Sequence, residues 1–185
     1  MSSTTHRAAD DALVRAARAG DEAAFAALVD RYGPGMYGYA RRLLGDHVDA
    51  GEAVQEALVS AWKSLDDFEG RSHIRTWLYR LVHRRAVDLQ RKRRPVPVED
   101  ESLSIMLPPA RTDPLQQVLD SELLVALQAA LETLPWNQRA CWLLREIEEM
   151  SYDEIAEAIG LTEGSVRGHL QRARQTLAER MAPWR

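Results

Sequence analysis

Prolines are concentrated in one short segment of this 185-residue chain. Five of the eight prolines lie between Pro95 and Pro114, among acidic and polar residues. Because proline fixes φ and has no backbone N–H, a segment this rich in proline cannot continue a helix. Helical periodicity runs up to the segment and resumes after it. The sequence therefore predicts an all-α protein of two small helical domains, 8–94 and 115–185, joined by a flexible linker over 95–114.

In the first domain, apolar residues recur at helical spacing along four stretches. Asp21 is placed to cap the first helix, and Pro34 is expected to begin the second. Gly45 is a stop signal, and Asp49 followed by Glu52 resembles a capping box for the third. The fourth helix is indicated by a clean apolar stripe: Ile74, Trp77, Leu78, Leu81 and Val82.

The second domain ends in a pattern typical of a helix–turn–helix. Ser151 and Glu154 form a capping box, Gly160 permits the positive φ of a sharp turn, and Thr162 can cap the next helix. The apolar side of that last helix is Val166, Leu170, Ala173 and Leu177. In a helix–turn–helix, the second helix enters the major groove of DNA. An ordinary helical hairpin would have the same spacing. Two helices are expected earlier in this domain, one from Leu115 and one from Trp136.

Positive charge is concentrated in two places, although the net charge of the chain is -4. Residues 71–94 contain nine basic residues and one acid, Asp88, which gives this segment a net charge of +8. From Arg167 to Arg185 there are five arginines and one acid, Glu179. Two basic patches on an acidic body indicate two separate contacts with a polyanion, although solvated helix faces could carry the same charges.

Two stretches resemble conserved parts of bacterial sigma factors. "DAGEAVQEALVSAWKSLDDFEGRSHIRTWLYRLVHRRAVDLQRKRR" is similar to the second conserved region, and "LPWNQRACWLLREIEEMSYDEIAEAIGLTEGSVRGHLQRARQTL" to the fourth. In this order, across a proline-rich linker, they resemble an extracytoplasmic-function (group IV) sigma factor over about Asp21 to Arg180. The resemblance implies an alternative sigma factor that binds core RNA polymerase, recognises the minus-ten and minus-thirty-five promoter elements and promotes DNA opening.

The resemblance also implies three sets of contact residues. Contacts with the minus-ten element are expected from Arg71, Ser72, His73, Arg75, Arg80, Arg84, Arg85 and Asp88. Contacts with the minus-thirty-five element are expected from Thr162, Glu163, Ser165, Arg167, His169, Gln171, Arg172 and Arg174. Contacts with core polymerase are expected from Asp49, Glu52, Gln55 and Glu56.

Chemical roles can be assigned within these sets. In the family, the loop before the fourth helix holds an unpaired base, and Arg71, Ser72 and His73 are the candidates for that contact, since cations and polar groups suit such a pocket. Trp77 lies on the apolar stripe and is expected in the core. Arg167, near the start of the last helix, is expected to read base edges. Arg172 and Arg174 are expected to hold phosphates.

Other classes of protein fit less well. A helix–turn–helix regulator that works without polymerase, or a purely helical interaction module, leaves the basic segment 71–94 unexplained. The five histidines show no metal-ligand spacing, and no phosphate-binding glycine loop is present, so no enzyme activity, metal or cofactor is expected. Cys141, the only cysteine, is expected to be a buried structural thiol.

The compartment and a further partner can also be predicted. A single cysteine forms no disulfide framework, which fits a reducing compartment. The first twenty residues lack the apolar core of a signal peptide, and no apolar stretch approaches the roughly 18 residues of a membrane span. The protein is therefore expected to be soluble and cytoplasmic. The family resemblance implies an anti-sigma factor as a partner.

Overall fold

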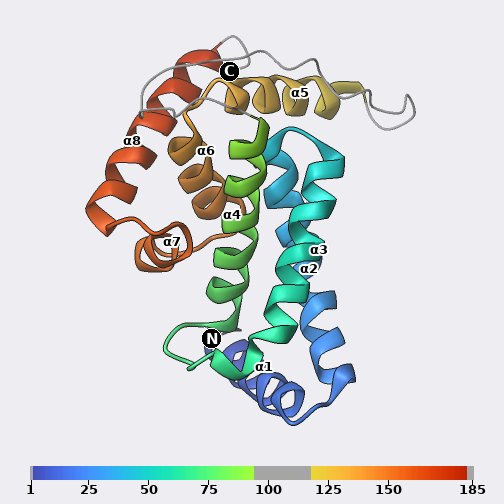
Figure 1. Cartoon of the computed structure of the whole chain (residues 1–185). Helices are drawn as coiled ribbons and strands as arrows, with labels where there is room; N and C mark the ends of the chain where they lie inside the picture. The colour runs from blue at the N-terminus through green and yellow to red at the C-terminus, as the bar shows by residue number, and fades with distance from the viewer. Residues whose placement is uncertain (1, 94–117, 183–185) are drawn as a thin grey trace.

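The structure, a computed structural model, describes residues 2–93 and 118–182, and within these ranges all the regular structure is helical, as predicted (Figure 1). The first half contains α1 (Ser2–Arg18), α2 (Glu22–Leu44), α3 (His47–Lys63), the short 3-10 turn η1 (Leu65–Asp67) and α4 (Ile74–Arg93). The second half contains α5 (Val118–Glu132), α6 (Trp136–Trp142), the π-helical turn η2 (Leu143–Ile147), α7 (Tyr152–Ile159) and α8 (Glu163–Arg180).

Two predictions about the first half are wrong. Pro34 does not begin a new helix but lies inside α2, because Leu28 before it and Met36 after it are buried in the same core. That burial offsets the cost of about 3 kcal/mol that proline imposes inside a helix. The third helix begins one turn earlier than expected, since Asp46, and not Asp49, accepts hydrogen bonds from the first free N–H groups.

Other local predictions are confirmed. The Asp21 carboxylate caps α2, and Gly45 ends that helix with a φ of 74°. In the second half, Ser151 and Glu154 form the expected capping box. Gly160 has a φ of 73°, which a glycine adopts without strain, and Thr162 caps α8 through the N–H of Ser165. These residues fix the turn between α7 and α8. The predicted helix start at Leu115 lies outside the described residues, as does the predicted linker.

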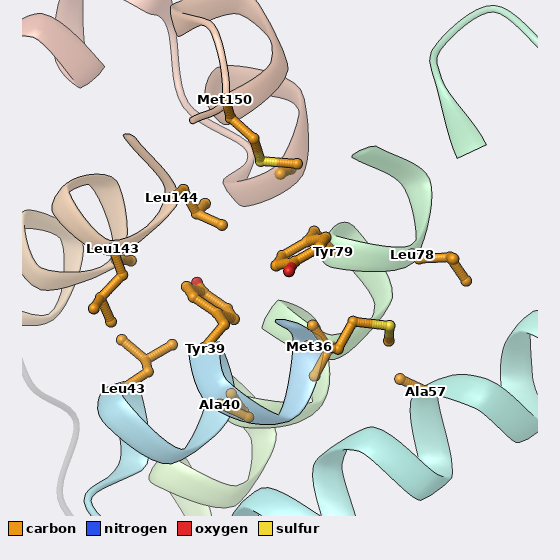
Figure 2. Close-up of a cluster of buried hydrophobic side chains, with 14 of the residues drawn as sticks. Met36, Tyr39, Ala40, Leu43, Ala57, Leu78, Tyr79, Leu143, Leu144 and Met150 are labelled. Atoms are coloured by element: carbon orange, nitrogen blue, oxygen red, sulfur yellow. The ribbon is translucent and has the colours of Figure 1, made fainter. Parts of the chain in front are cut away.

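The two halves pack against each other along α4 and α2. In Figure 1, α4 stands between the helices of the first half and α6 and α7 of the second. Tyr39 on α2 and Tyr79 on α4 share one buried cluster with Leu143, Leu144 and Met150 from the second half (Figure 2). The hydrophobic core therefore runs across the boundary between the halves.

Polar contacts also cross this boundary. Arg139 of α6 donates a hydrogen bond of 3.0 Å to the carbonyl of Leu43 at the end of α2. The hydroxyl of Tyr39 lies 2.7 Å from Nδ1 of His83, and the ring of His83 lies beside that of Trp136, with centroids 6.2 Å apart. Burial lowers the pKa of His83 to about 4, so its ring is neutral near pH 7. His83 is therefore buried at the boundary as a neutral ring.

Candidate nucleic-acid interface

Helix α8 has the geometry expected of a recognition helix. Its buried face consists of Val166, Leu170, Ala173 and Leu177, as predicted. On the opposite side of α8, residues spaced three or four positions apart form a ridge: Gly164, Gly168, Gln171 and Gln175. A Cβ atom on Gly164 would meet only the Thr162 hydroxyl, at 4.0 Å. Packing within the chain therefore gives no reason for this glycine, which leaves the ridge low and open to a partner.

The predicted minus-thirty-five residues occupy both flanks of this ridge. On one flank, the Arg167 guanidinium lies 5.4 Å from the ring centre of Tyr152 and 3.6 Å from Glu163. Further along, Arg174 hydrogen-bonds to Glu146 through Nε at 3.0 Å and Nη2 at 2.6 Å. On the other flank lie Ser165, His169 and Arg172. The chain thus brings these candidates together on one exposed surface.

The loop before α4 is held at both ends. Phe68 at its start is buried, with its ring centre 5.2 Å from that of Trp77, which lies in the core as predicted. His73 at its end brings Nε2 to 3.5 Å from the Asp10 carboxylate. Between them, Arg71 is exposed and pairs with Glu69. The loop therefore presents a cation to solvent, while His73 is turned inward.

The N-terminal half of α4 faces the second half of the molecule. Arg75 hydrogen-bonds to the carbonyl of Glu148 and lies 3.4 Å from its carboxylate. The hydroxyl of Tyr79 donates to the same carboxylate at 2.5 Å, and burial raises the pKa of Tyr79, which keeps this proton in place. Nearby, Arg80 lies 3.9 Å from Glu157. Two of the predicted minus-ten arginines therefore contact acids of the second half.

The C-terminal half of α4 is more open. Arg84 and Asp88 are exposed on one face. Arg85 lies closer to α3, with Ser60 at 3.1 Å and Glu56 at 3.6 Å. The members of the predicted minus-ten set that lie on α4 are consequently split between its N-terminal half, which contacts the second half of the molecule, and its more open C-terminal half.

The predicted polymerase contacts on α3 are also divided. Glu52, Gln55 and Glu56 are exposed. Asp49 is turned inward and forms an ion pair of 2.6 Å with Arg93. Sequence reasoning missed two apolar neighbours on the same exposed stripe: Val48, 62% exposed, and Val59, 47% exposed. Their spacing from Glu52 and Gln55 could have revealed them, because residues three or four positions apart share one face of a helix.

Both halves match known protein families. The family described as Sigma-70 region 2 matches residues 28–96, and that described as Sigma-70, region 4 matches residues 124–177. The sigma-E factor of Haemophilus influenzae is 32% identical, over 94% of this chain and 96% of its own length. The chain belongs to the extracytoplasmic-function sigma factors. Another relative, SigW of Bacillus subtilis, is 29% identical over 91% of this chain and 94% of its own length.

Solved sigma factors share this arrangement of the two halves. CnrH in complex with the cytosolic domain of CnrY superposes with a TM-score of 0.72 at 28% identity, covering 95% of this chain and 98% of CnrH. RpoE of Bartonella quintana, in complex with the anti-sigma factor NepR, superposes with a TM-score of 0.66 at 26% identity, covering 85% and 96%. The packing of region 4 on region 2 in this chain is thus similar to that in sigma factors bound by another protein.

Membership in this family defines the general function. The protein is an alternative sigma factor that directs promoter recognition by RNA polymerase. Its relatives are transcription initiation factors and are not known as enzymes. In the described part of the chain, none of the helices is long and apolar enough to cross a membrane.

Proposed function

We propose that this sigma factor reads the minus-ten element with residues 71–88 and the minus-thirty-five element with α8, after the two halves have separated. One observation carries the proposal: Arg75 bonds Glu148 and Arg80 lies beside Glu157, whereas the ridge of α8 faces outward. The closed arrangement is then that of the free protein, and the open one is that of the protein on a promoter.

Distances along DNA support the need for opening. The centres of the two elements are about 25 base pairs apart, which is roughly 85 Å at 3.4 Å per base pair. A compact chain of this length has a radius of gyration of about 16 Å, so its surfaces cannot lie that far apart. Residues 94–117 could span at most roughly 80 Å when fully extended. That length is sufficient to let each half reach its own element.

In the open state, the loop and α4 would meet the minus-ten element. Arg71 and Ser72 would hold an unpaired base, and Arg80 and Arg84 would face the duplex edge. Both ring nitrogens of His73 are directed at groups of the chain itself, so we assign His73 to holding the loop. Arg75 becomes available to DNA only when it leaves Glu148.

On α8, we assign base reading to Arg167 and phosphate binding to Arg172 and Arg174. Arg167 lies in the first turns of the helix, the end that points into the groove in helix–turn–helix proteins. The low ridge at Gly164 would let the backbone of α8 approach the base edges closely. Arg174 would have to share or leave its bond to Glu146 on reaching DNA.

Core polymerase would bind the exposed stripe of α3, centred on Glu52, Gln55 and Glu56 and bordered by Val48 and Val59. Because this stripe is exposed in the closed arrangement, polymerase could bind before the halves separate. A second protein of the anti-sigma type could hold the closed arrangement, since RpoE of Bartonella quintana forms a complex with the anti-sigma factor NepR. Because bacterial RNA polymerase acts in the cytoplasm, a sigma factor that binds it is expected in the cytoplasm.

Run-off transcription tests the proposal. Core polymerase with the full-length protein should initiate from a subset of genomic promoter fragments, and core polymerase alone should not. The substitution Arg84→Ala should reduce that transcription without reducing capture of core polymerase. A protein that binds promoter fragments but neither captures core polymerase nor supports initiation would contradict the proposal and favour a regulator that works without polymerase.

A further inference from the structure

Helix α1 lies before the segment that matches Sigma-70 region 2. One of its acidic residues, Asp10, is completely buried. Asp10, Val14 and Ala17 follow one another at helical spacing, and all three are turned into the core. A buried carboxylate costs free energy unless charged or polar partners satisfy it. The partners of Asp10 therefore indicate what the residue does.

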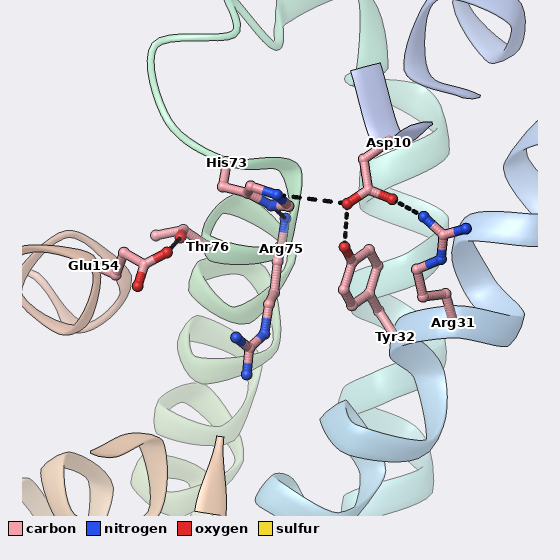
Figure 3. A network of polar contacts seen from close by, with 7 residues as sticks. All are labelled: Asp10, Arg31, Tyr32, His73, Arg75, Thr76 and Glu154. Carbon is pink, nitrogen blue, oxygen red and sulfur yellow. Dashed lines mark hydrogen bonds and ion pairs between the residues drawn. The ribbon is translucent and has the colours of Figure 1, made fainter. Parts of the chain in front are cut away.

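Asp10 contacts side chains from two other parts of the first half (Figure 3). On α2, the guanidinium of Arg31 and the hydroxyl of Tyr32 both donate hydrogen bonds to its carboxylate. Immediately before α4, Nε2 of His73 lies 3.5 Å from Oδ2 of the same carboxylate. Because two side chains of α2 hold Asp10 in place, it provides a fixed point for His73.

His73 also caps the N-terminus of α4. Its Nδ1 accepts a hydrogen bond of 3.2 Å from the N–H of Arg75, and its carbonyl accepts one of 3.2 Å from the N–H of Trp77. Since Nδ1 is the acceptor, the neutral ring carries its proton on Nε2, toward Asp10. Burial lowers the pKa of His73, so the ring is neutral near pH 7. Asp10 thus orients the ring that caps α4.

The same helix holds the start of the loop. Arg18, two turns after Asp10, donates hydrogen bonds of 2.7 Å to the carbonyl of Asp66 and of 3.3 Å to that of Phe68. Side chains of α1 therefore contact the chain on both sides of residues 69–72, at Asp66 and Phe68 before them and at His73 after them.

We propose that α1 positions the loop 69–72, with Arg18 fixing its start and Asp10, through His73, fixing its end. The inference rests on the proposed function, in which Arg71 and Ser72 of this loop hold an unpaired base. A pocket for a single base is selective only when its walls are held in place by neighbouring contacts. Asp10 and Arg18 are positioning residues, since they act on the base through the loop.

The test uses holoenzyme assembled from core polymerase and full-length Asp10→Asn or Arg18→Gln protein. Asp30→Asn and Arg15→Gln are matched controls, because both residues are exposed and undergo the same change in charge. Permanganate reactivity of thymines in the bubble measures opening on a set of promoters with single-base changes in the minus-ten element. We expect opening by both test variants to fall roughly tenfold on the preferred promoter, since each loses at least one charge-assisted hydrogen bond and one such bond is worth about that factor.

The ranking of promoters separates positioning from simple loss of stability. A less stable protein would open all promoters less well and in the same order, whereas a displaced loop should flatten the preference at one minus-ten position. Test variants that keep the wild-type order, or that match their controls, would overturn the proposal. If Asp10→Asn does not fold, Arg18→Gln decides, since the Arg18 side chain is 41% exposed and its loss leaves no buried charge.

Two further variants distinguish this proposal from the proposed function itself. Arg71→Ala and Ser72→Ala should reduce opening whether or not α1 positions the loop. If both open promoters normally, the base-holding role of the loop is wrong, and the role of α1 in positioning it is wrong too. If both fail to open promoters while the α1 variants match their controls, only the role of α1 is wrong.

Discussion

The two helices proposed to read DNA, α4 and α8, differ in how much of their reading surface is covered. On α4, the Arg75 side chain is 27% exposed and bonds Glu148. On α8, the Arg167 side chain is 65% exposed, and its carboxylate partner, Glu163, lies on the same helix. The proposed reading surface of region 4 is therefore exposed in the closed arrangement, whereas Arg75 of region 2 first has to leave Glu148.

The difference follows from what covers each helix. The Glu148 carboxylate is 12% exposed and receives both Arg75 and Tyr79. Gly35 of α2 makes room for this group, because a Cβ atom there would lie 2.6 Å from the Tyr79 hydroxyl and 3.2 Å from the Glu148 carboxylate. The polar contact at Glu148, together with the shared core, would have to break before α4 meets a promoter.

Shortening the connection between the halves should have the largest effect. Removing residues 100–109 lowers the greatest possible span of 94–117 from roughly 80 Å to about 50 Å. Run-off transcription should fall by more than about tenfold, because the second half could no longer reach its element while the first is bound. Urea unfolding should show little change in stability. Unchanged transcription would contradict the need for a long connection.

Neutralising the Glu148 carboxylate should have the next largest effect. Glu148→Gln keeps the carbonyl that accepts from Arg75, but it weakens the bonds of Arg75 and Tyr79 to the side chain, which as hydrogen bonds to a charged group are worth about 1.5–3 kcal/mol. The free protein should then bind a single-stranded minus-ten oligonucleotide roughly tenfold more tightly. Glu149→Gln is the matched control, since Glu149 is exposed beside it. Equal binding by the two variants would show that this contact does not restrain α4.

Truncating Arg167 should change specificity on α8 without any need for opening. Arg167→Ala should cost about 1–3 kcal/mol of discrimination at one position of the minus-thirty-five element. Arg174→Ala should weaken all sequences alike and lower the salt slope by about one unit. Holoenzyme binding to a library of single-base variants at two salt concentrations measures both. If Arg167→Ala weakens every sequence equally, base reading belongs to another residue of α8.

Replacing a glycine of the ridge should have the smallest effect. It should raise the stability of the protein and weaken its binding to DNA. Gly164→Ala should stabilise the protein by up to about 1 kcal/mol, since glycine is a poor helix former. It should also weaken minus-thirty-five binding, because the new methyl group would stand between α8 and the groove. Gly33→Ala is the control, since its Cβ would meet only Val29, at 3.8 Å. A stabilised variant with unchanged binding would remove the ridge from the interface.

Features fixed by neighbours in the sequence could be predicted, and features fixed by the other half could not. The turn at Gly160 and the core position of Trp77 depend on local spacing. Thr76, Tyr79 and His83 are buried off the predicted stripe of α4, because the second half covers them. Such burial depends on contacts between distant parts of the chain. Helix α1 was missed for a related reason: its buried stripe begins with an acid, Asp10, where an apolar residue is expected.

Energy transfer between the two halves tests the central claim most directly. Fluorophores on Lys63→Cys of α3 and Ala129→Cys of α5 report their separation, since both positions are exposed and neither is among the proposed DNA contacts. Cys141 should not react, because it is buried and burial raises the pKa of its thiol to about 12. We expect high transfer in the free protein and a marked fall when core polymerase and promoter DNA are added together. Transfer that stays high in a transcribing complex, or is already low in the free protein, would contradict a closed arrangement that opens to read the promoter.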